Sequence, residues 1–249
     1  MSLYKSDALI LRTYKLGDAD CIVVFLTRDR GKRRGVAKGA RRMRSRFAGG
    51  LEPLTHARVA YFEREHRDLV RLNYVEPVTS PFASRSVEML GHTGYFAELI
   101  DHWALEGDPS EKLFRLGSSV ITAMLADVPV EKIARYFEYW LMRLQGTYPS
   151  ISRCHQCDAN LIDRGALLSL RDGVFMCLSC GSTDGEVELS PESLEFLQMA
   201  ATIAPDRLRD AVLTPLATRE LAVAHRRLIS FHLDKELKSV RVLRALSAE

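Results

Sequence analysis

The first eighty residues alternate short apolar runs with turn-prone polar segments, which is the pattern of β-strands. β-branched and other apolar residues dominate four of the runs, and a fifth run carries glycine and basic residues. The expected strands cover residues 8–11, 21–26, 33–38, 58–62 and 69–75. Five short strands in so little chain predict a small closed sheet, because closure removes the edges that would pair with other chains. An SH3-like barrel and an OB-fold both fit this pattern.

A polar break at residues 77–81, bracketed by two prolines, ends the strand pattern, because neither a strand nor a helix continues readily through proline. Beyond it, apolar side chains recur at helical spacing. Two such stripes predict helices that face a core, Met89, Phe96, Ile100 and Trp103 in the first and Ile133, Phe137, Trp140 and Leu144 in the second. Gly146 follows the second stripe as the expected C-terminal stop.

Start signals predict two further helices in the last quarter of the chain. Ser190 and Thr214 each precede a proline at the first helical position, and we expect the hydroxyl side chain to cap the helix. The last helical stretch is expected to run from about Ala217 past Leu243, with a break near Asp234. Residues 149–189 lack helical periodicity and hold four of the five cysteines, which indicates a small insertion. The helices on either side of it are expected to pack together.

The four clustered cysteines form two C-x2-C pairs, Cys154 with Cys157 and Cys177 with Cys180, separated by nineteen residues. Two residues between cysteines let a tight turn direct both thiolates at one ion, and two such turns complete the tetrahedron that Zn²⁺ prefers. Four thiolates leave no position for water, so we expect one structural zinc ion. Gly181 is expected to serve the second turn with a positive φ. Two short strands, at residues 166–170 and 173–176, would complete a zinc-ribbon-like hairpin.

Other interpretations of the cysteines stay open at this level. The spacing argues against four unrelated buried thiols, a redox motif would need only one pair, and an iron–sulfur cluster is also compatible with cysteine-only ligation. His155 lies inside the first pair, and an exposed loop position is favoured over a competing ligand. Cys21 is interpreted as a small core residue. An odd cysteine count and an N-terminus without a signal-like apolar region argue against disulfides and predict a cytosolic protein.

Positive charge is concentrated in one segment. Residues 28–46 carry ten basic residues and one acid, a balance of +9, whereas the whole chain is only +3. Such a density predicts a polyanionic partner, with a solvated surface as the alternative. If about half of these cations neutralise a phosphate of a single strand, the log–log salt slope is about −3.5. The predicted nucleic-acid contacts are Lys32, Arg33, Arg34, Lys38, Arg41, Arg42, Arg44 and Arg46.

Glycines flank the second half of this segment, which predicts a mobile loop over residues 40–50 that orders on contact with phosphates. Phe47 lies within the loop, and it is the aromatic residue for which we predict stacking on bases. No Walker loop, H-E-x-x-H, G-x-S-x-G or strand-linked G-x-G-x-x-G occurs. We therefore predict no catalytic residue, and a binding protein is favoured over an enzyme.

The C-terminal residues 231–244 predict an amphipathic helix with a basic edge. Leu237, Val240 and Leu243 would form its apolar side, beside Lys238, Arg241 and Arg244. A helix of this kind usually closes a bundle. Contact with an acidic partner or DNA is the second interpretation.

In their order along the chain, these features resemble the RecO family of bacterial recombination mediators. The resemblance rests on five segments and extends over nearly the whole sequence. The segments are Ala8-Leu9-Ile10-Leu11-Arg12-Thr13-Tyr14, Gly17-Asp18-Ala19-Asp20, Phe25-Leu26-Thr27 leading to Gly31, Ala37-Lys38-Gly39-Ala40-Arg41-Arg42, and Leu237-Lys238-Ser239, together with the four cysteines. The part up to Gly39 is the most specific, since the cysteine pattern alone fits many zinc ribbons.

The resemblance implies an α+β protein with an N-terminal OB-fold, a helical domain and a zinc-ribbon-like module with four cysteine ligands inserted in the helical domain. The expected limits are 1–80 for the OB-fold, 81–149 and 190–249 for the helical domain, and 150–189 for the insertion. Lys38, Arg41 and Arg42 match the family's basic loop. Some relatives lack the cysteines, which supports a structural zinc.

Function follows from the resemblance as an expectation. Family members bind single- and double-stranded DNA, anneal complementary strands, and work with RecR and single-stranded-DNA-binding protein (SSB) to load RecA in recombinational repair. The implied location is the cytoplasm, in association with the nucleoid. Two rivals stay open: a zinc-ribbon factor that binds RNA or the ribosome, and a zinc-dependent nuclease, which would need an exchangeable ligand position that four cysteines do not leave.

Overall fold

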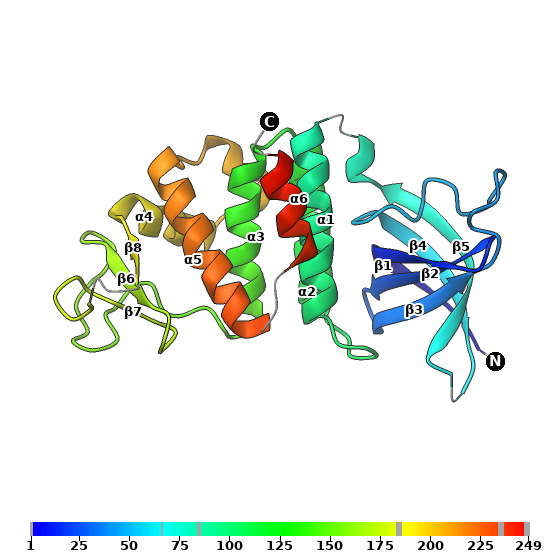
Figure 1. The fold of residues 1–249 in the computed structure, drawn as a ribbon, viewed down its shortest axis with the longest axis horizontal. Coiled ribbons are helices and arrows are strands. Elements are labelled where there is room, and N and C mark those ends of the chain that lie inside the picture. Colours follow the sequence, from blue (N-terminus) through cyan, green and yellow to red (C-terminus); the bar gives the residue numbers. More distant parts are fainter. Residues whose placement is uncertain (1, 66, 84–85, 183–185, 234–236, 247–249) are drawn as a thin grey trace. The chain divides into compact units, whose positions relative to one another are not determined.

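Figure 1 shows the computed structural model, which describes residues 2–65, 67–83, 86–182, 186–233 and 237–246. The chain divides into two compact units. The barrel unit comprises Met1–Leu125 with Leu237–Glu249, and the cysteine unit comprises Ala126–Glu236. This division falls inside the region predicted as one helical domain, so both units contain helices. The domain limits inferred from the sequence stay a prediction.

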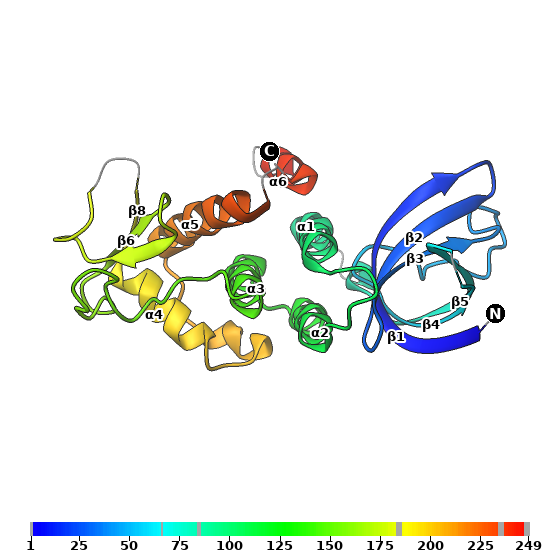
Figure 2. The ribbon, with the colours of Figure 1, turned by 90° about the horizontal axis from the view of Figure 1, so that it is seen from below.

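Five strands close into a barrel in the barrel unit, and all five correspond to predicted strands (Figure 2). They are β1 (Ser2–Leu16), β2 (Asp20–Thr27), β3 (Gly31–Ala37), β4 (His56–Glu63) and β5 (Leu69–Thr79). The order around the barrel is β1-β2-β3-β5-β4. Neighbours pair antiparallel except β3 with β5, which run parallel over three residue pairs. This five-stranded closed sheet is of the OB type.

Alternate strand positions point into the barrel and bury an aromatic-rich core. Phe25 and Tyr61 are fully buried, with ring centroids 5.6 Å apart. Gly35 lets β3 approach this core closely, because a Cβ there would lie 2.9 Å from Cγ2 of Val70 and 3.2 Å from Cγ of Leu72. A larger residue at position 35 would disturb the short parallel pairing that closes the barrel.

The barrel unit also contains η1 (Pro81–Ala83), α1 (Val87–Trp103), α2 (Glu111–Leu125) and the C-terminal α6 (Lys238–Leu246). The first predicted stripe faces the core: Met89, Phe96 and Ile100 are buried, and Trp103 is half-buried. α6 packs on α1, where Gly91 allows close approach: a Cβ there would lie 2.7 Å from Leu246 and 3.1 Å from Leu243. The predicted helix break near Asp234 lies outside the described residues.

The cysteine unit combines helices with a three-stranded sheet in the order β7-β6-β8. Its elements are α3 (Val130–Leu144), β6 (Ala166–Ser169), β7 (Val174–Met176), β8 (Val187–Leu189), α4 (Pro191–Ala200), η2 (Pro205–Asp210) and α5 (Pro215–Leu233). The predicted hairpin is confirmed as β6 and β7, and β8 is an addition that the sequence pattern did not indicate. The helices on either side of the insertion pack together as expected, since Trp140 Nε1 on α3 donates to the carbonyl of Ala200 at 2.9 Å.

The expected signals at the ends of these helices have different outcomes. Gly146 follows α3 with a φ of +70°, and the Thr214 hydroxyl accepts the backbone N–H of Ala217 at 3.1 Å. Ser190 precedes α4, but its side chain makes no capping hydrogen bond to the helix backbone. Its hydroxyl instead donates to Oε2 of Glu220 on α5 at 2.7 Å. The capping prediction for Ser190 is wrong: its hydroxyl is directed at the Glu220 carboxylate and so does not accept a backbone N–H of α4.

A buried polar triad links α3, α5 and the segment that leads into the cysteine module. His225 Nδ1 lies 2.9 Å from Oε2 of Glu138, and its Nε2 lies 2.9 Å from the hydroxyl of Tyr148. Arg135 adds a hydrogen bond to Glu138 at 3.1 Å. Burial lowers the pKa of His225, although Glu138 raises it in part. Burial also raises the pKa of Tyr148 well above its ordinary value.

No helix in the described ranges is both long enough and apolar enough to cross a membrane.

Candidate nucleic-acid interface and metal centre

The basic segment consists of a strand half, residues 28–37, and a loop half. In the strand half, most cations lie close to acidic side chains of the same unit. Lys32 Nζ lies 3.2 Å from Oδ1 of Asp101 and also donates to the Asp101 carbonyl. Arg28 pairs with Glu111 on α2 at 2.8 Å. Arg33 and Arg34 lie near acids as well, with nitrogen-to-oxygen distances of 3.8 Å to Glu63 and 4.0 Å to Glu106. Lys32, Arg28 and Arg34 thus connect the barrel to segments outside it, whereas the Arg33 contact joins two strands of the barrel.

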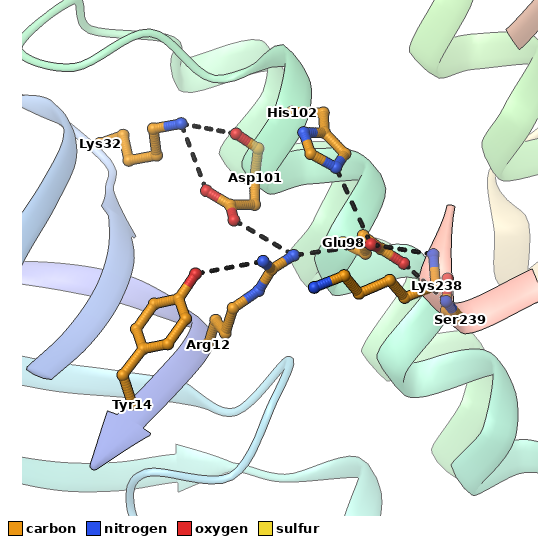
Figure 3. A network of polar contacts seen from close by, with 8 residues as sticks. All are labelled: Arg12, Tyr14, Lys32, Glu98, Asp101, His102, Lys238 and Ser239. Atoms are coloured by element: carbon orange, nitrogen blue, oxygen red, sulfur yellow. Dashed lines mark hydrogen bonds and ion pairs between the residues drawn. The ribbon is translucent and has the colours of Figure 1, made fainter. Parts of the chain in front are cut away.

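Figure 3 shows the polar network where the barrel meets α1 and α6. Arg12 of β1 lies 3.4 Å from Asp101 and 3.7 Å from Glu98. Glu98 also accepts the first two backbone N–H groups of α6, from Lys238 at 3.2 Å and Ser239 at 2.8 Å. A carboxylate on α1 therefore caps another helix, at the end where the helix dipole favours negative charge. Burial raises the pKa of Glu98, but the hydrogen bonds from Ser239 and Lys238 outweigh it and lower the pKa overall.

The loop half, residues 38–50, carries exposed cations. Lys38, Arg42 and Arg44 are exposed and form no ion pair with an acid in the described part of the chain. Arg41 is also exposed, but its guanidinium donates to the carbonyls of Gly17 and Asp18 at 3.2 and 3.1 Å. This contact ties the loop to the turn between β1 and β2.

Phe47 does not lie where base stacking requires it. Its side chain is only 1% exposed and belongs to the barrel core, with the guanidinium of Arg46 5.0 Å from the ring centroid. The stacking prediction is wrong, because an apolar ring gains more by anchoring the loop in the core than by remaining in water. The loop itself is a series of turns closed by backbone hydrogen bonds, including Arg42 to Gly39 and Gly50 to Phe47. The expected mobility of residues 40–50 stays a prediction.

A groove of about 530 Å³ lies on the outer barrel surface beside the loop. Apolar side chains and Arg71 form its floor, and the other cations form its rim. The lining residues are Val36, Lys38, Phe62, Arg64, Arg67, Asp68, Leu69, Val70 and Arg71. Four cations face one acid here, and the sequence analysis missed three of those cations. The sequence did contain a signal for these cations, since a basic residue follows an apolar residue by two positions at Phe62/Arg64 and at Leu69/Arg71.

The four predicted cysteine ligands come together in the cysteine unit. The Sγ atoms of Cys154, Cys157, Cys177 and Cys180 all lie within 4.8 Å of one another, and all four thiols are free. The Sγ atoms of Cys157 and Cys177 are 3.7 Å apart, close to the ~3.8 Å edge of a tetrahedron with 2.3 Å metal–sulfur bonds. These cysteines can hold a single metal ion, whereas a multi-iron cluster spreads its ligands over several metal atoms.

Backbone hydrogen bonds shape both turns around the thiols. The N–H groups of Cys180 and Gly181 donate to the Cys177 carbonyl at 3.0 Å, and Asp158 donates to the Cys154 carbonyl at 3.0 Å. His155 is exposed, as expected. Gly181 does not have the predicted positive φ, which occurs instead at Asp158 with a φ of 60°. Glycine at 181 is required for space, because a Cβ would lie 2.7 Å from Leu167.

Protonation of the thiols is uneven because they share hydrogen bonds. Burial raises the pKa of Cys154, whereas backbone donors from Cys177, Cys157 and Gln156 together lower it to about 6. Side-chain hydrogen bonds to Cys177 and Cys157 raise the pKa of Cys180 to about 12. Complete deprotonation of the cluster therefore calls for a cation among the sulfurs.

Comparison with known proteins agrees with this arrangement. The family model described as Recombination protein O N terminal matches residues 1–81, and the model described as Recombination protein O C terminal matches residues 85–241. The chain belongs to the RecO family. The DNA repair protein RecO of Koribacter versatilis (strain Ellin345) is 33% identical over 97% of this chain and 98% of the relative.

Other RecO proteins match over similar lengths. DNA repair protein RecO of Geobacter metallireducens is 30% identical over 100% of both chains, and that of Pelotomaculum thermopropionicum is 30% identical over 98% of this chain and 94% of the relative. These relatives are named DNA repair proteins, and both family models are described as recombination protein O. The OB-type barrel, the helices and the cysteine cluster agree with the architecture expected from the resemblance to the RecO family.

Proposed function

We propose that this chain binds single- and double-stranded DNA through the basic loop of residues 38–50 and the adjacent outer barrel surface. The proposal rests on how the cations of the basic segment divide into those paired with acids and those that remain exposed. The strand half is paired with acids, whereas Lys38, Arg42 and Arg44 remain exposed beside a groove that holds three further cations. Lys38 belongs to both the loop and the groove lining, so it connects the two sets of cations. A concentration of cations without acid partners is the electrostatic footprint of a nucleic-acid surface.

Annealing follows from the same charge distribution. Two DNA strands repel each other through their phosphates, and a surface that neutralises both backbones lowers that repulsion while leaving the bases free to pair. The cations act on phosphates and not on base edges, so binding is nearly independent of sequence. The chemistry requires no catalytic residue.

We further propose a mediator role in recombinational repair, in which the protein acts with RecR on SSB-coated strands and helps to load RecA. Membership of the RecO family supports this role and implies a location in the cytoplasm at the nucleoid. We assign the cysteine cluster to one structural Zn²⁺, held by Cys154, Cys157, Cys177 and Cys180. The donor set and the sulfur spacing support zinc.

The test compares the wild type with a variant that carries Arg41→Ala, Arg42→Ala, Arg44→Ala and Arg46→Ala. Titration of labelled single strands at several salt concentrations should show at least ~tenfold weaker binding at low salt and a slope shallower by up to ~2.8. The matched control replaces the same four residues with lysine, which keeps the charge and should keep most of the slope. Unchanged affinity and slope in the alanine variant would refute the assignment of the loop.

Annealing is measured separately with two complementary fluorescent strands at moderate salt. Acceleration by the wild type, reduced in the alanine variant, supports the proposed function, and SSB-coated strands are then the next substrate. Tight binding to structured RNA without acceleration of annealing would favour the RNA-binding factor instead.

A further inference from the structure

The floor of the groove is a row of side chains across three neighbouring strands. Val36 of β3 pairs with Arg71 of β5, and Arg71 pairs with Phe62 of β4. The preceding residues Val70 and Tyr61 point into the barrel core. Because side chains alternate between the two faces of a strand, Val36, Phe62 and Arg71 point outward together.

Apolar surface and positive charge meet in this row. Phe62 and Val36 are half-buried, and Leu69 is 37% exposed. Lys38, Arg64, Arg67 and Arg71 surround them, with Asp68 as the single acid of the lining. The half-buried Phe62 ring offers part of its apolar surface to a ligand in the groove, and the surrounding cations favour an anionic ligand.

The size and chemistry of the groove fit one nucleotide. Its volume of about 530 Å³ lies within the range of small-molecule sites. A base offers an apolar face for the phenyl ring and for the aliphatic stem of an arginine, and its phosphates offer charge to the rim. A double helix cannot use such a site without extruding a base, which costs a few kcal/mol.

We infer that this groove receives a single unpaired base of a DNA strand, stacked on Phe62, and that it favours single strands over duplexes. The inference rests on the proposed function and adds a division of labour to it. The basic loop contacts phosphates of either DNA form, and the groove distinguishes the two forms.

The decisive variant is Phe62→Leu, which removes the aromatic ring and keeps an apolar side chain. Affinity for an oligothymidine single strand should fall about tenfold, in line with the loss of one stacked base, while affinity for a duplex of equal length stays the same. Phe62→Trp should restore single-strand binding. Equal weakening of both DNA forms, or no weakening of either, would overturn the inference.

Two further measurements do not depend on how well the Phe62 variants fold. Leu69→Asp places a carboxylate in the groove at an exposed strand end and should show the same selective loss. An oligonucleotide with 5-iododeoxyuridine, photocrosslinked to the wild type, should label a peptide that contains Phe62. Crosslinks confined to residues 38–50 would leave the loop assignment intact and contradict the groove. A wild type that binds neither DNA form would refute the proposed function itself.

Discussion

The barrel unit and the cysteine unit are stabilised by different chemistry. In the barrel unit, strand pairing closes a core that contains fully buried Phe25, Phe47 and Tyr61. In the cysteine unit, the sheet is formed by strands of only three or four residues beside the cluster of thiols. A sheet this small buries little apolar surface by itself, so a metal ion held by the four thiols, as proposed above, would add a cross-link that the barrel does not need.

The two units also differ in how far their polar groups are shielded from water. In the barrel unit, ion pairs between the barrel and α1 join side chains that remain partly exposed to water. The cysteine unit encloses His225 completely, between Glu138 and Tyr148. The barrel unit should therefore tolerate changes of metal and mild acid that the cysteine unit does not.

The largest effect is expected from Cys177→Ser, which removes one ligand and leaves the other three thiols close together. The variant should lose its zinc, and amides of β6 and β7 should exchange rapidly, because structural Zn²⁺ contributes on the order of 10 kcal/mol to such modules. Metal content after gel filtration and hydrogen exchange measure the two effects.

Cys21→Ser is the matched control, because Cys21 is a half-buried thiol of β2 outside the cluster. It should retain the metal. If Cys177→Ser left a protected β6–β7 hairpin without metal, the contrast between the units would not hold.

An intermediate effect is expected from pH. Burial lowers the pKa of His225 below its ordinary value, so the unfolded state binds the proton more readily than the folded state. This contribution to stability is present above the unfolded pKa of about 6.5 and is lost as the pH falls below it, by up to ~1.4 kcal/mol per pH unit. Urea unfolding of the cysteine unit at saturating zinc between pH 7.5 and 5.5 should show that loss.

His225→Gln tests the origin of the pH effect. Glutamine keeps a hydrogen-bonding side chain but does not titrate, so the variant should be less stable at pH 7.5 and less sensitive to acid. An acid sensitivity equal to that of the wild type would assign the effect to other groups.

The smallest effect is expected in the barrel unit, from Glu98→Gln. The amide keeps one oxygen that can accept an N–H of α6, but an NH2 donor replaces the second oxygen, and the charge that faces Arg12 and the N-terminus of that helix is lost. A loss of about 1 kcal/mol is expected, seen as faster exchange of amides in α6. Glu88→Gln, at an exposed position in the first turn of the same helix, is the control and should leave the exchange of the α6 amides unchanged. Equal effects of both substitutions would mean that Glu98 does not cap α6.

The barrel and the cysteine cluster could be predicted from the sequence because their signals are local. Alternating runs define strands one at a time, and Cys154 and Cys157 are three positions apart. Whether a given cation pairs with an acid depends on residues that are distant in the sequence. Lys32 and Lys38 lie in one basic run, yet only Lys32 meets Asp101, which is 69 positions away. A charge count cannot anticipate such a pairing.

Long-range contacts also explain the remaining differences. In the sequence, Phe47 is an aromatic residue in a basic loop. Only the closed barrel provides the core in which its ring is buried. The floor of the groove needs Val36, Phe62 and Arg71 in one row, and only the strand register brings them together. The sequence therefore indicated the loop cations Lys38, Arg42 and Arg44 but not the groove beside Lys38, whose lining depends on the strand register.

The position of α6 in the chain bears on how the protein is made. The barrel and α1 leave the ribosome early, but α6, which covers Gly91 and donates backbone hydrogen bonds to Glu98, is translated after the other elements that the structure describes. A nine-residue helix is not stable alone, so α6 folds as it docks. Until translation reaches that point, the nascent chain has a formed barrel and an uncovered apolar stretch of α1, and that stretch is where a chaperone or a protease has access.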